Sequence, residues 1–147
     1  MMAVHQHERL AAVRERVRAG GRRWTIAKGA IVEALIGHGG HLSVQEVHDE
    51  ITTRFPQIDR STVHRVLLTL ADEHVVHVLG RQGEARYGMA DQPHHHAVCA
   101  RCGHEAEIPA SAVAPALATA AEATGFAFDS VGITLTGICG DCRQQHP

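Results

Sequence analysis

All four cysteines of the chain form two Cys-x-x-Cys pairs, Cys99/Cys102 and Cys139/Cys142. Two such pairs supply the four thiolates of a tetrahedral structural zinc site, and the fold only has to bring the pairs together. Residues 103–138 separate the pairs, more than the roughly 15–20 residues of a compact zinc ribbon, so we expect a helix and strands between them. Local disulfides or a redox pair are the alternatives, and an N-terminus without a secretory signal disfavours a disulfide framework. The sequence therefore predicts a four-cysteine structural zinc site.

Three consecutive histidines, His94, His95 and His96, directly precede the first cysteine pair. Alternation along a strand places His94 and His96 on one face, so that both can bind one ion. Imidazoles suit zinc, iron, nickel and copper, and a carboxylate would complete the site for several of these ions. An exposed polar strand end is the alternative. We predict a second metal site, whose remaining ligands belong to the set His41, His77, Asp91, His104, Glu105 and Glu107.

The composition fits one medium domain or two small ones. The chain has 147 residues, 44% of them hydrophobic, but only three Phe, one Tyr and one Trp. Its cores must therefore be aliphatic and modest, which favours additional stabilisation from metal and from oligomerisation. No apolar run approaches about 18 residues, and the N-terminus resembles neither a secretory signal nor a lipidation site. We expect a soluble cytoplasmic protein without a membrane partner.

The formal net charge of −2 hides an asymmetry along the chain. Residues 1–30 carry seven Arg or Lys against two Glu, whereas residues 94–147 carry two Arg against five acidic residues. A basic front half indicates a polyanionic partner, and an acidic rear half indicates a part that does not touch it. A solvated basic helix is the alternative explanation.

Four segments of the N-terminal half have helical periodicity. A basic amphipathic helix is expected over residues 8–18, and a second helix begins after Thr25. Ser43 and Glu46 form a capping box that opens a third helix. The fourth helix, over residues 61–73, has an apolar stripe on one face; the opposite face carries Arg60, Thr62, His64 and Arg65.

Two short β-prone runs follow, over residues 75–79 and 84–87, joined by a Gly-Arg-Gln-Gly turn. Helix, turn, helix and hairpin together predict a winged helix-turn-helix. In that geometry the helix over residues 61–73 lies in the major groove, and Arg81 of the hairpin contacts phosphate. Residues 1–87 would form this domain, and residues 88–93 are expected to form a hinge.

A second, smaller domain is expected over residues 94–147. A strand (residues 104–108), an Ala-rich helix (residues 111–124) and a strand region (residues 126–138) are predicted between the cysteine pairs. In the last of these, Val131, Ile133 and Leu135 alternate as on one face of a strand. The predicted fold class is α+β, an N-terminal winged helix-turn-helix followed by a small α/β domain with the four-cysteine zinc site.

Four motifs occur along the chain in this order: Gly21-Arg-Arg-Trp-Thr25, His41-Leu-Ser43-x4-His48, Ser61-Thr-Val-His-Arg65 and His94-x-His96-x2-Cys99-x2-Cys102-Gly103. A chain with these motifs resembles the ferric uptake regulator family of metal-dependent repressors, nearest to its zinc-uptake and peroxide-sensor branches. The resemblance covers most of the chain, from Gly21 to Cys142. It implies a homodimer held together by the C-terminal domains.

The resemblance also implies a regulatory metal site at the hinge. Its ligands map onto His41, His94, His96 and Glu107, and in the zinc-uptake branch a further ligand aligns with His77. The sequence departs from the family pattern just after Tyr87, the tyrosine of the predicted wing, where the family usually has a carboxylate. Gly88 or Met89 stands there instead, so His77 or Asp91 would have to replace the missing carboxylate as a ligand.

Two further positions depart from the family. Its additional C-terminal metal site is lost, since the corresponding residues are His95, Ala114 and Val131. The tyrosine of the recognition helix is replaced by His64, which alters the expected base preference.

We therefore predict a homodimeric, metal-responsive repressor of transcription that binds double-stranded operator DNA. It would hold one structural Zn²⁺ and a second divalent ion, with zinc favoured over iron, manganese and nickel. Phosphate contacts are expected from Arg16, Arg23 and Arg81, and base contacts from His64 and Arg65.

Two other functions compete with this prediction. One is an iron-dependent peroxide or redox sensor, although the family's peroxide branch relies on an Asp where Gly88 stands. The other is a zinc hydrolase or deaminase, suggested by His104-Glu105. The spacing of those two residues does not fit such chemistry, and a zinc ion held by four cysteines has no open position. We expect no enzyme activity and no small-molecule substrate.

Overall fold

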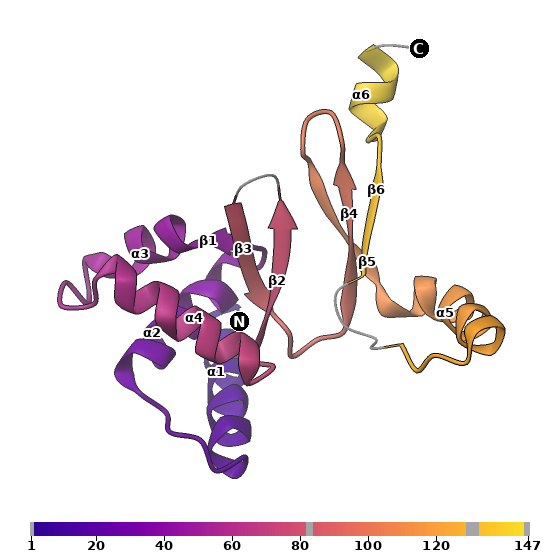
Figure 1. Cartoon of the computed structure of the whole chain (residues 1–147). Coiled ribbons are helices and arrows are strands. Elements are labelled where there is room, and N and C mark those ends of the chain that lie inside the picture. Colours follow the sequence, from indigo (N-terminus) through magenta and orange to yellow (C-terminus); the bar gives the residue numbers. More distant parts are fainter. Residues whose placement is uncertain (1, 82–83, 129–132, 146–147) are drawn as a thin grey trace. The chain divides into compact units, whose positions relative to one another are not determined.

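A computed structural model describes residues 2–81, 84–128 and 133–145. The chain divides into two compact units, Met1–Asp91 and Gln92–Pro147, and each is described by itself (Figure 1). Val131, one of three residues predicted to alternate on a strand, lies outside the described residues.

Four helices make up most of the N-terminal unit: α1 (Met2–Ala19), α2 (Ile26–His38), α3 (Val44–Thr52) and α4 (Arg60–Asp72). Thr25 caps α2 by accepting a hydrogen bond from the backbone N–H of Lys28. Ser43 and Glu46 form the predicted capping box of α3, with both reciprocal hydrogen bonds present. Side-chain oxygens at these positions satisfy backbone donors that a helix start would otherwise leave unpaired.

The start of α4 differs from the sequence prediction. The helix begins at Arg60, and Asp59 is its N-cap, accepting a hydrogen bond of 2.7 Å from the backbone N–H of Thr62. Ser61, predicted as the first residue of this helix, already lies inside its first turn. Asp is among the residues that cap helix starts best, which explains the earlier start.

A three-stranded antiparallel sheet completes this unit. It consists of β1 (Leu42–Ser43), β2 (Val76–Arg81) and β3 (Glu84–Met89), in the order β1-β3-β2. The order of helices and strands is that of the predicted winged helix-turn-helix. Gly88 and Met89, predicted as part of a hinge, are the last residues of β3, so the connector that remains before β4 comprises residues 90–93.

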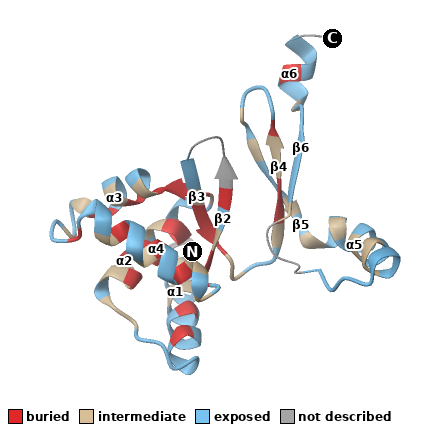
Figure 2. Ribbon diagram, viewed as in Figure 1, coloured by how far each residue is buried: buried red, intermediate tan, exposed pale blue. Residues whose placement is uncertain are grey.

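The core of the N-terminal unit is aliphatic, as its few aromatic residues require. Buried residues, red in Figure 2, occur in all four helices and in the sheet of this unit. The buried apolar stripe of α4 packs against α2 and α3; its fully buried members are Val63, Leu67 and Leu70. This packing leaves the opposite face of α4 exposed to solvent.

The C-terminal unit contains β4 (His94–Cys99), β5 (Glu105–Pro109), α5 (Ala110–Thr124), β6 (Thr134–Gly137) and α6 (Gly140–Gln145). The strand order is β5-β4-β6, with β4 antiparallel to β5 and parallel to β6. Within the predicted strand region of residues 126–138, only β6 is a strand among the residues that the structure describes. The short α6 was not predicted from the sequence.

Little of the C-terminal unit is buried. Helix α5 has no buried residue although it is rich in Ala, and β6 is exposed along its whole length (Figure 2). Large apolar side chains stand in solvent at Phe126, Phe128, Leu135 and Ile138. Large exposed apolar side chains gathered in one small unit are typical of a surface that another chain covers.

None of the helices in the described parts of the chain is both long and apolar enough to cross a membrane.

Candidate metal centres

The four cysteines meet at one end of the C-terminal sheet. Because β4 and β6 run parallel, with Cys99 opposite Gly137, both strands end at the same edge. Cys99 ends β4, and Cys139 lies two residues after the end of β6. Their partners lie just beyond, Cys102 in the turn to β5 and Cys142 in α6. Parallel pairing therefore brings together two cysteine pairs that are far apart in the sequence.

Local backbone structure shapes each cysteine pair. In the first, Gly103 adopts a φ of 72° and donates its backbone N–H to the Cys99 carbonyl at 2.9 Å. A left-handed conformation of this kind favours glycine. The backbone N–H of His104 points at Cys102 Sγ (3.4 Å), and that of Cys139 at Cys99 Sγ (3.3 Å). Hydrogen bonds of this kind stabilise thiolates.

The geometry fits a tetrahedral zinc ion. All four sulfur atoms lie within 4.8 Å of one another, and Cys102 Sγ is 3.7 Å from Cys139 Sγ. Two sulfurs bound to one tetrahedral zinc at about 2.3 Å are about 3.8 Å apart. A disulfide would need about 2.05 Å, and all four cysteines are free thiols. The arrangement therefore suits metal coordination and not two local disulfides.

The pKa values of the thiols differ because each thiol has different hydrogen-bond partners. Backbone N–H groups of Cys102 and Cys139 lower the pKa of Cys99 to about 5. Hydrogen bonds with the side chains of Cys102 and Cys139 raise the pKa of Cys142 to about 12. One thiol of the set thus ionises easily and another resists ionisation. A bound dication supplies the positive charge that lets all four be thiolates at once.

Two members of a second set of possible ligands lie on the sheet β1-β3-β2 of the N-terminal unit, here called the wing sheet. Leu42 pairs with Tyr87 in the β1–β3 register, which puts His41 opposite Gly88; His77 of β2 pairs with Gly88 from the other side. The two imidazoles meet, with 2.7 Å between their Nε2 atoms. His41 is only 7% exposed. Two histidines predicted as ligands are therefore adjacent within one unit.

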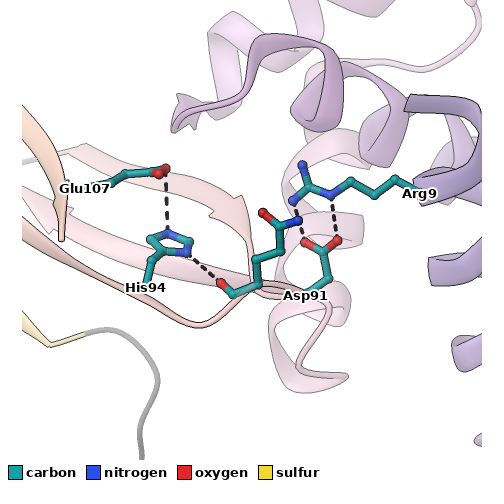
Figure 3. A network of polar contacts seen from close by, with 5 residues as sticks. Arg9, Asp91, His94 and Glu107 are labelled. Carbon is teal, nitrogen blue, oxygen red and sulfur yellow. Dashed lines mark hydrogen bonds and ion pairs between the residues drawn. The ribbon is translucent and has the colours of Figure 1, made fainter. Parts of the chain in front are cut away.

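The remaining predicted histidine ligands lie on β4, in the C-terminal unit. The rings of His94 and His96 are in contact, with 4.7 Å between centroids. His94 Nδ1 lies 2.7 Å from the Gln92 carbonyl oxygen, which can only accept, so Nδ1 carries the proton (Figure 3). His94 Nε2, on the other side of the ring, lies 3.9 Å from a carboxylate oxygen of Glu107. A backbone carbonyl that sets the tautomer in this way is typical of metal-binding histidines.

Histidine must be neutral to bind a metal. Burial, and next the neighbouring His94, lower the pKa of His96. His96 is 1% exposed and stands opposite Glu107 in the β4–β5 register. The C-terminal unit thus places two adjacent imidazoles beside one carboxylate, and the surroundings of His96 favour its neutral form.

Asp91, the alternative to His77 as a ligand, is engaged elsewhere. Both of its carboxylate oxygens accept hydrogen bonds of 2.6 Å from Arg9 of α1 (Figure 3). Burial would raise the pKa of Asp91, but the Arg9 guanidinium outweighs burial and holds it below its ordinary value. No local pattern indicated this pair, because the two residues are far apart in the chain. His77, and not Asp91, is the residue that lies against His41.

The predicted DNA-contacting residues of α4 lie on its solvent side. Arg60, His64 and Arg65 are exposed, and Thr62 is half-buried. Arg65 donates a hydrogen bond to the Thr62 hydroxyl at 3.2 Å. Arg16 on α1 and Arg23 before α2 are also exposed. Arg81 is the last residue of β2, and its side chain lies outside the described part of the structure.

With these sites in view, comparison with known proteins decides the family. The sequence model of the ferric uptake regulator family matches residues 19–136. The chain belongs to the ferric uptake regulator family. It is therefore a metal-responsive regulator of transcription and not an enzyme.

Individual relatives agree with this assignment. The zinc uptake regulation protein of Mycobacterium tuberculosis is 35% identical over 128 residues, covering 86% of this chain and 98% of the relative. A solved zinc uptake regulator complexed with zinc and DNA shares 25% identity, with a TM-score of 0.67 and coverage of 95% and 96%. The Helicobacter pylori ferric uptake regulator has the same fold, with a TM-score of 0.74 at 22% identity and coverage of 94% and 96%. The predicted fold class is thereby confirmed.

One group of contacts in this regulator connects His41 to the helix-turn-helix. Arg86 of β3 donates to the backbone carbonyl of His41 at 2.8 Å, and its guanidinium also pairs with Glu46 at 3.0 Å. Glu46 accepts the backbone N–H of Ser43 at the start of α3. Next to it, Gln45 accepts a hydrogen bond from Arg60, the first residue of α4. The capping box was predicted from the sequence but Arg86 was missed, because its alternation on β3 gave no hint of these partners.

Acid should weaken this connection. The Ser43 backbone N–H, and to a lesser degree Arg86, lower the pKa of Glu46 in the folded state. The unfolded chain therefore binds a proton more readily. The resulting stability is present above the unfolded pKa of about 4.3 and is lost as pH falls through the folded pKa.

We expect Glu46→Gln to lower stability near neutral pH by about 0.3–1 kcal/mol, as for an acid in a first helical turn. The difference from the wild type should shrink as pH falls below the unfolded pKa of about 4.3 and disappear below the folded pKa of Glu46. Thermal unfolding between pH 3 and 7 measures it. Glu50→Gln, at an exposed acid of the same helix, is the matched control. If the unfolding temperatures of Glu46→Gln and the wild type change with pH in the same way, Glu46 does not have the stabilising role assigned to it.

Proposed function

We propose that this protein is a cytoplasmic, homodimeric repressor whose regulatory metal controls operator binding. The observation that carries the proposal is that each unit presents a pair of contacting imidazoles. His41 and His77 form one pair in the N-terminal unit, and His94 and His96 form the other in the C-terminal unit. Only residues 90–93 lie between the strands of the two units, so the pairs belong to units joined by a short connector.

The regulatory site in this proposal takes ligands from both units: His41, His77, His94, His96 and Glu107. Side chains of two units that bind one ion restrict rotation about the connector. The recognition helices of the dimer are then held for two adjacent segments of the major groove. Without the ion, this restriction on rotation is absent. Ligation thus favours one member of a set of conformations, which is what a metal-dependent switch requires.

The four-cysteine site is proposed to be structural. Four thiolates close a tetrahedral zinc site completely and leave no position for a substrate or a regulatory ligand. A structural Zn²⁺ would also compensate for the small buried core of the C-terminal unit. For the regulatory site we favour zinc, with iron, manganese and nickel as the ions to be compared.

A second copy of this chain is the proposed cover of the exposed apolar surface in the C-terminal unit. That surface consists of α5, β6 and the side chains of Phe126, Phe128, Leu135 and Ile138. Homodimers bury apolar surfaces of this kind. Residues 94–147 are therefore proposed as the dimerisation domain, and residues 1–87 as the DNA-binding domain.

Positioning and reading of DNA are assigned to different residues. Arg16, Arg23 and Arg81 are proposed to contact phosphates, with Arg60 and Thr62 at the start of α4 completing the contact surface. His64 and Arg65 are proposed to reach base edges in the major groove.

We predict that His64→Ala relaxes base preference at one operator position by about 1–3 kcal/mol, because imidazole can contact a purine N7 or a thymine methyl. Arg16→Ala should instead weaken binding to all sequences alike and lower the salt slope by about one. Titration of a selected duplex and of scrambled duplexes at several salt concentrations measures both effects. If His64→Ala leaves preference unchanged at every position, α4 is not the reading helix.

The function itself is tested by selecting duplexes from a random pool with and without Zn²⁺. Enrichment of one two-fold symmetric sequence only when the ion is present is the expected outcome. A metal-independent selection, or no selection with any of the four ions, would contradict the proposal. An iron-dependent peroxide sensor is less well supported, because Gly88 stands where that branch has an Asp.

A further inference from the structure

We infer that Gly88 sets the metal preference of the regulatory site by letting His41 and His77 meet above it as an all-imidazole pair. This inference rests on the proposed function, since it concerns the N-terminal half of the proposed site. It concerns a residue that is not itself a ligand.

The three residues form one row across the wing sheet. Gly88 of β3 lies between His41, next to β1, and His77 of β2. Neighbouring strands are about 4.8 Å apart, so the backbones of the two histidines are separated by about 9.6 Å. Paired residues in a row point to the same face of a sheet. Both imidazoles must therefore lean over the central position to bring their Nε2 atoms within 2.7 Å of each other.

A side chain at position 88 would occupy the space that the His41 ring fills. A Cβ built on Gly88 lies 2.6 Å from both Cδ2 and Nε2 of His41, and 3.3 Å from Cε1. The two distances of 2.6 Å are too short for carbon–carbon or carbon–nitrogen contact. The His41 ring would have to turn away, although it is 7% exposed and in contact with His77. Any residue other than glycine would consequently separate the two imidazoles.

Glycine at this position has no local structural advantage. Gly weakens a strand interior, where it often marks a close approach by another group. Gly88 has no positive φ that would require glycine. The close approach here is that of the His41 ring. The reason for glycine is thus the space above it and not the shape of the backbone.

The chemical consequence is a nitrogen-rich site. Two imidazoles bound to one tetrahedral zinc have nitrogens about 3.3 Å apart, so the observed pair needs to open only slightly. A carboxylate at position 88 would add an oxygen ligand and move the His41 ring away from His77. Imidazole favours zinc and nickel, whereas carboxylate oxygens suit manganese. Gly88 therefore favours Zn²⁺ over Mn²⁺ in this half of the site.

The first test is Gly88→Ala, with metal binding and ring contact as readouts. Competition of the zinc-loaded dimer with a chromophoric chelator should show Zn²⁺ affinity at the second site lowered by about 10–100-fold, the range for residues that orient metal ligands. In the protein without regulatory metal, imidazole nitrogen NMR should show loss of the His41–His77 hydrogen bond. Gly37→Ala is the control, because a Cβ at Gly37 meets nothing within 4 Å.

A double-mutant cycle separates this effect from general damage to the strand. In a His41→Ala background there is no ring for the new methyl group to displace, so Gly88→Ala should have no further effect. Gly88→Asp should lower the ratio of Zn²⁺ to Mn²⁺ affinity by about 10–100-fold. Wild-type affinity and selectivity in both Gly88 variants, or an equal loss in the His41→Ala background, would overturn the inference.

The same measurements show which idea has failed. If His41→Ala and His77→Ala themselves keep the second metal at wild-type affinity, the proposed regulatory site is wrong. If both histidine variants lose the second metal, while Gly88→Ala and Gly88→Asp bind it as the wild type does, the proposed site is right and only the role of Gly88 is wrong.

Discussion

Replacement of Cys99 by serine is expected to remove one zinc ion per chain and most of the stability of the C-terminal unit. Cys99 is buried at the end of β4, where backbone N–H groups lower the pKa of its thiol to about 5. Loss of one thiolate opens a closed tetrahedral site. Binding energies of about 10–16 kcal/mol for structural zinc are also folding energy, as large as the whole stability of a typical domain, about 5–15 kcal/mol.

Metal analysis, sedimentation and thermal unfolding of Cys99→Ser measure this together. We expect loss of zinc, loss of the dimer and a non-cooperative transition for the C-terminal unit. The N-terminal unit has its own aliphatic core and should still unfold cooperatively. His104→Ala, beside Cys102 but outside the four-thiol set, is the control. A zinc-free Cys99→Ser protein that remains a cooperatively folded dimer would refute the structural role.

His41→Ala and His96→Ala are expected to have the same phenotype, although the residues belong to different units. Each variant should keep the four-cysteine zinc ion, the dimer and its fold, and yet lose metal-dependent DNA binding. The physical reason is that an ion held by one unit alone cannot restrict rotation about residues 90–93. A typical coupling of about 1–3 kcal/mol corresponds to about 5–150-fold in DNA affinity.

Anisotropy titrations of a selected duplex, with and without Zn²⁺, compare these variants with the wild type. His38→Ala is the matched control, since His38 is an exposed histidine at the end of α2. If only one of the two variants loses the metal response, the site does not join the units. If neither does, the hinge site is wrong altogether.

Local signals allowed much of the fold to be predicted from sequence. The capping residues Thr25 and Ser43, the apolar stripe of α4 and the alternation around the hairpin each depend on a few neighbouring residues. The structure contains these elements with boundaries shifted by small amounts. Contacts between residues far apart in the chain were harder to predict. The paired Cys-x-x-Cys motifs predicted a cluster, but not that parallel pairing of β4 and β6 would assemble it.

The histidine site shows the same limit. Alternation on a strand predicted that His94 and His96 share a face, and their rings are in contact. The contact of His41 with His77 depends on the register of three strands and on an absent side chain at Gly88. The engagement of Asp91 by Arg9 depends on packing of α1. Such relations are properties of the folded chain, and no local pattern contains them.

Reciprocal linkage tests the central claim most directly, namely that the regulatory metal and the operator favour the same conformation. Zn²⁺ affinity of the second site is measured by chelator competition, with the four-cysteine site filled, in the absence and presence of a saturating selected duplex. Linkage requires DNA to raise the Zn²⁺ affinity by the same factor by which Zn²⁺ raises the DNA affinity, about 5–150-fold for typical couplings. We predict equal factors in the wild type and none in His41→Ala or His96→Ala. A Zn²⁺ affinity that DNA does not change would contradict this claim.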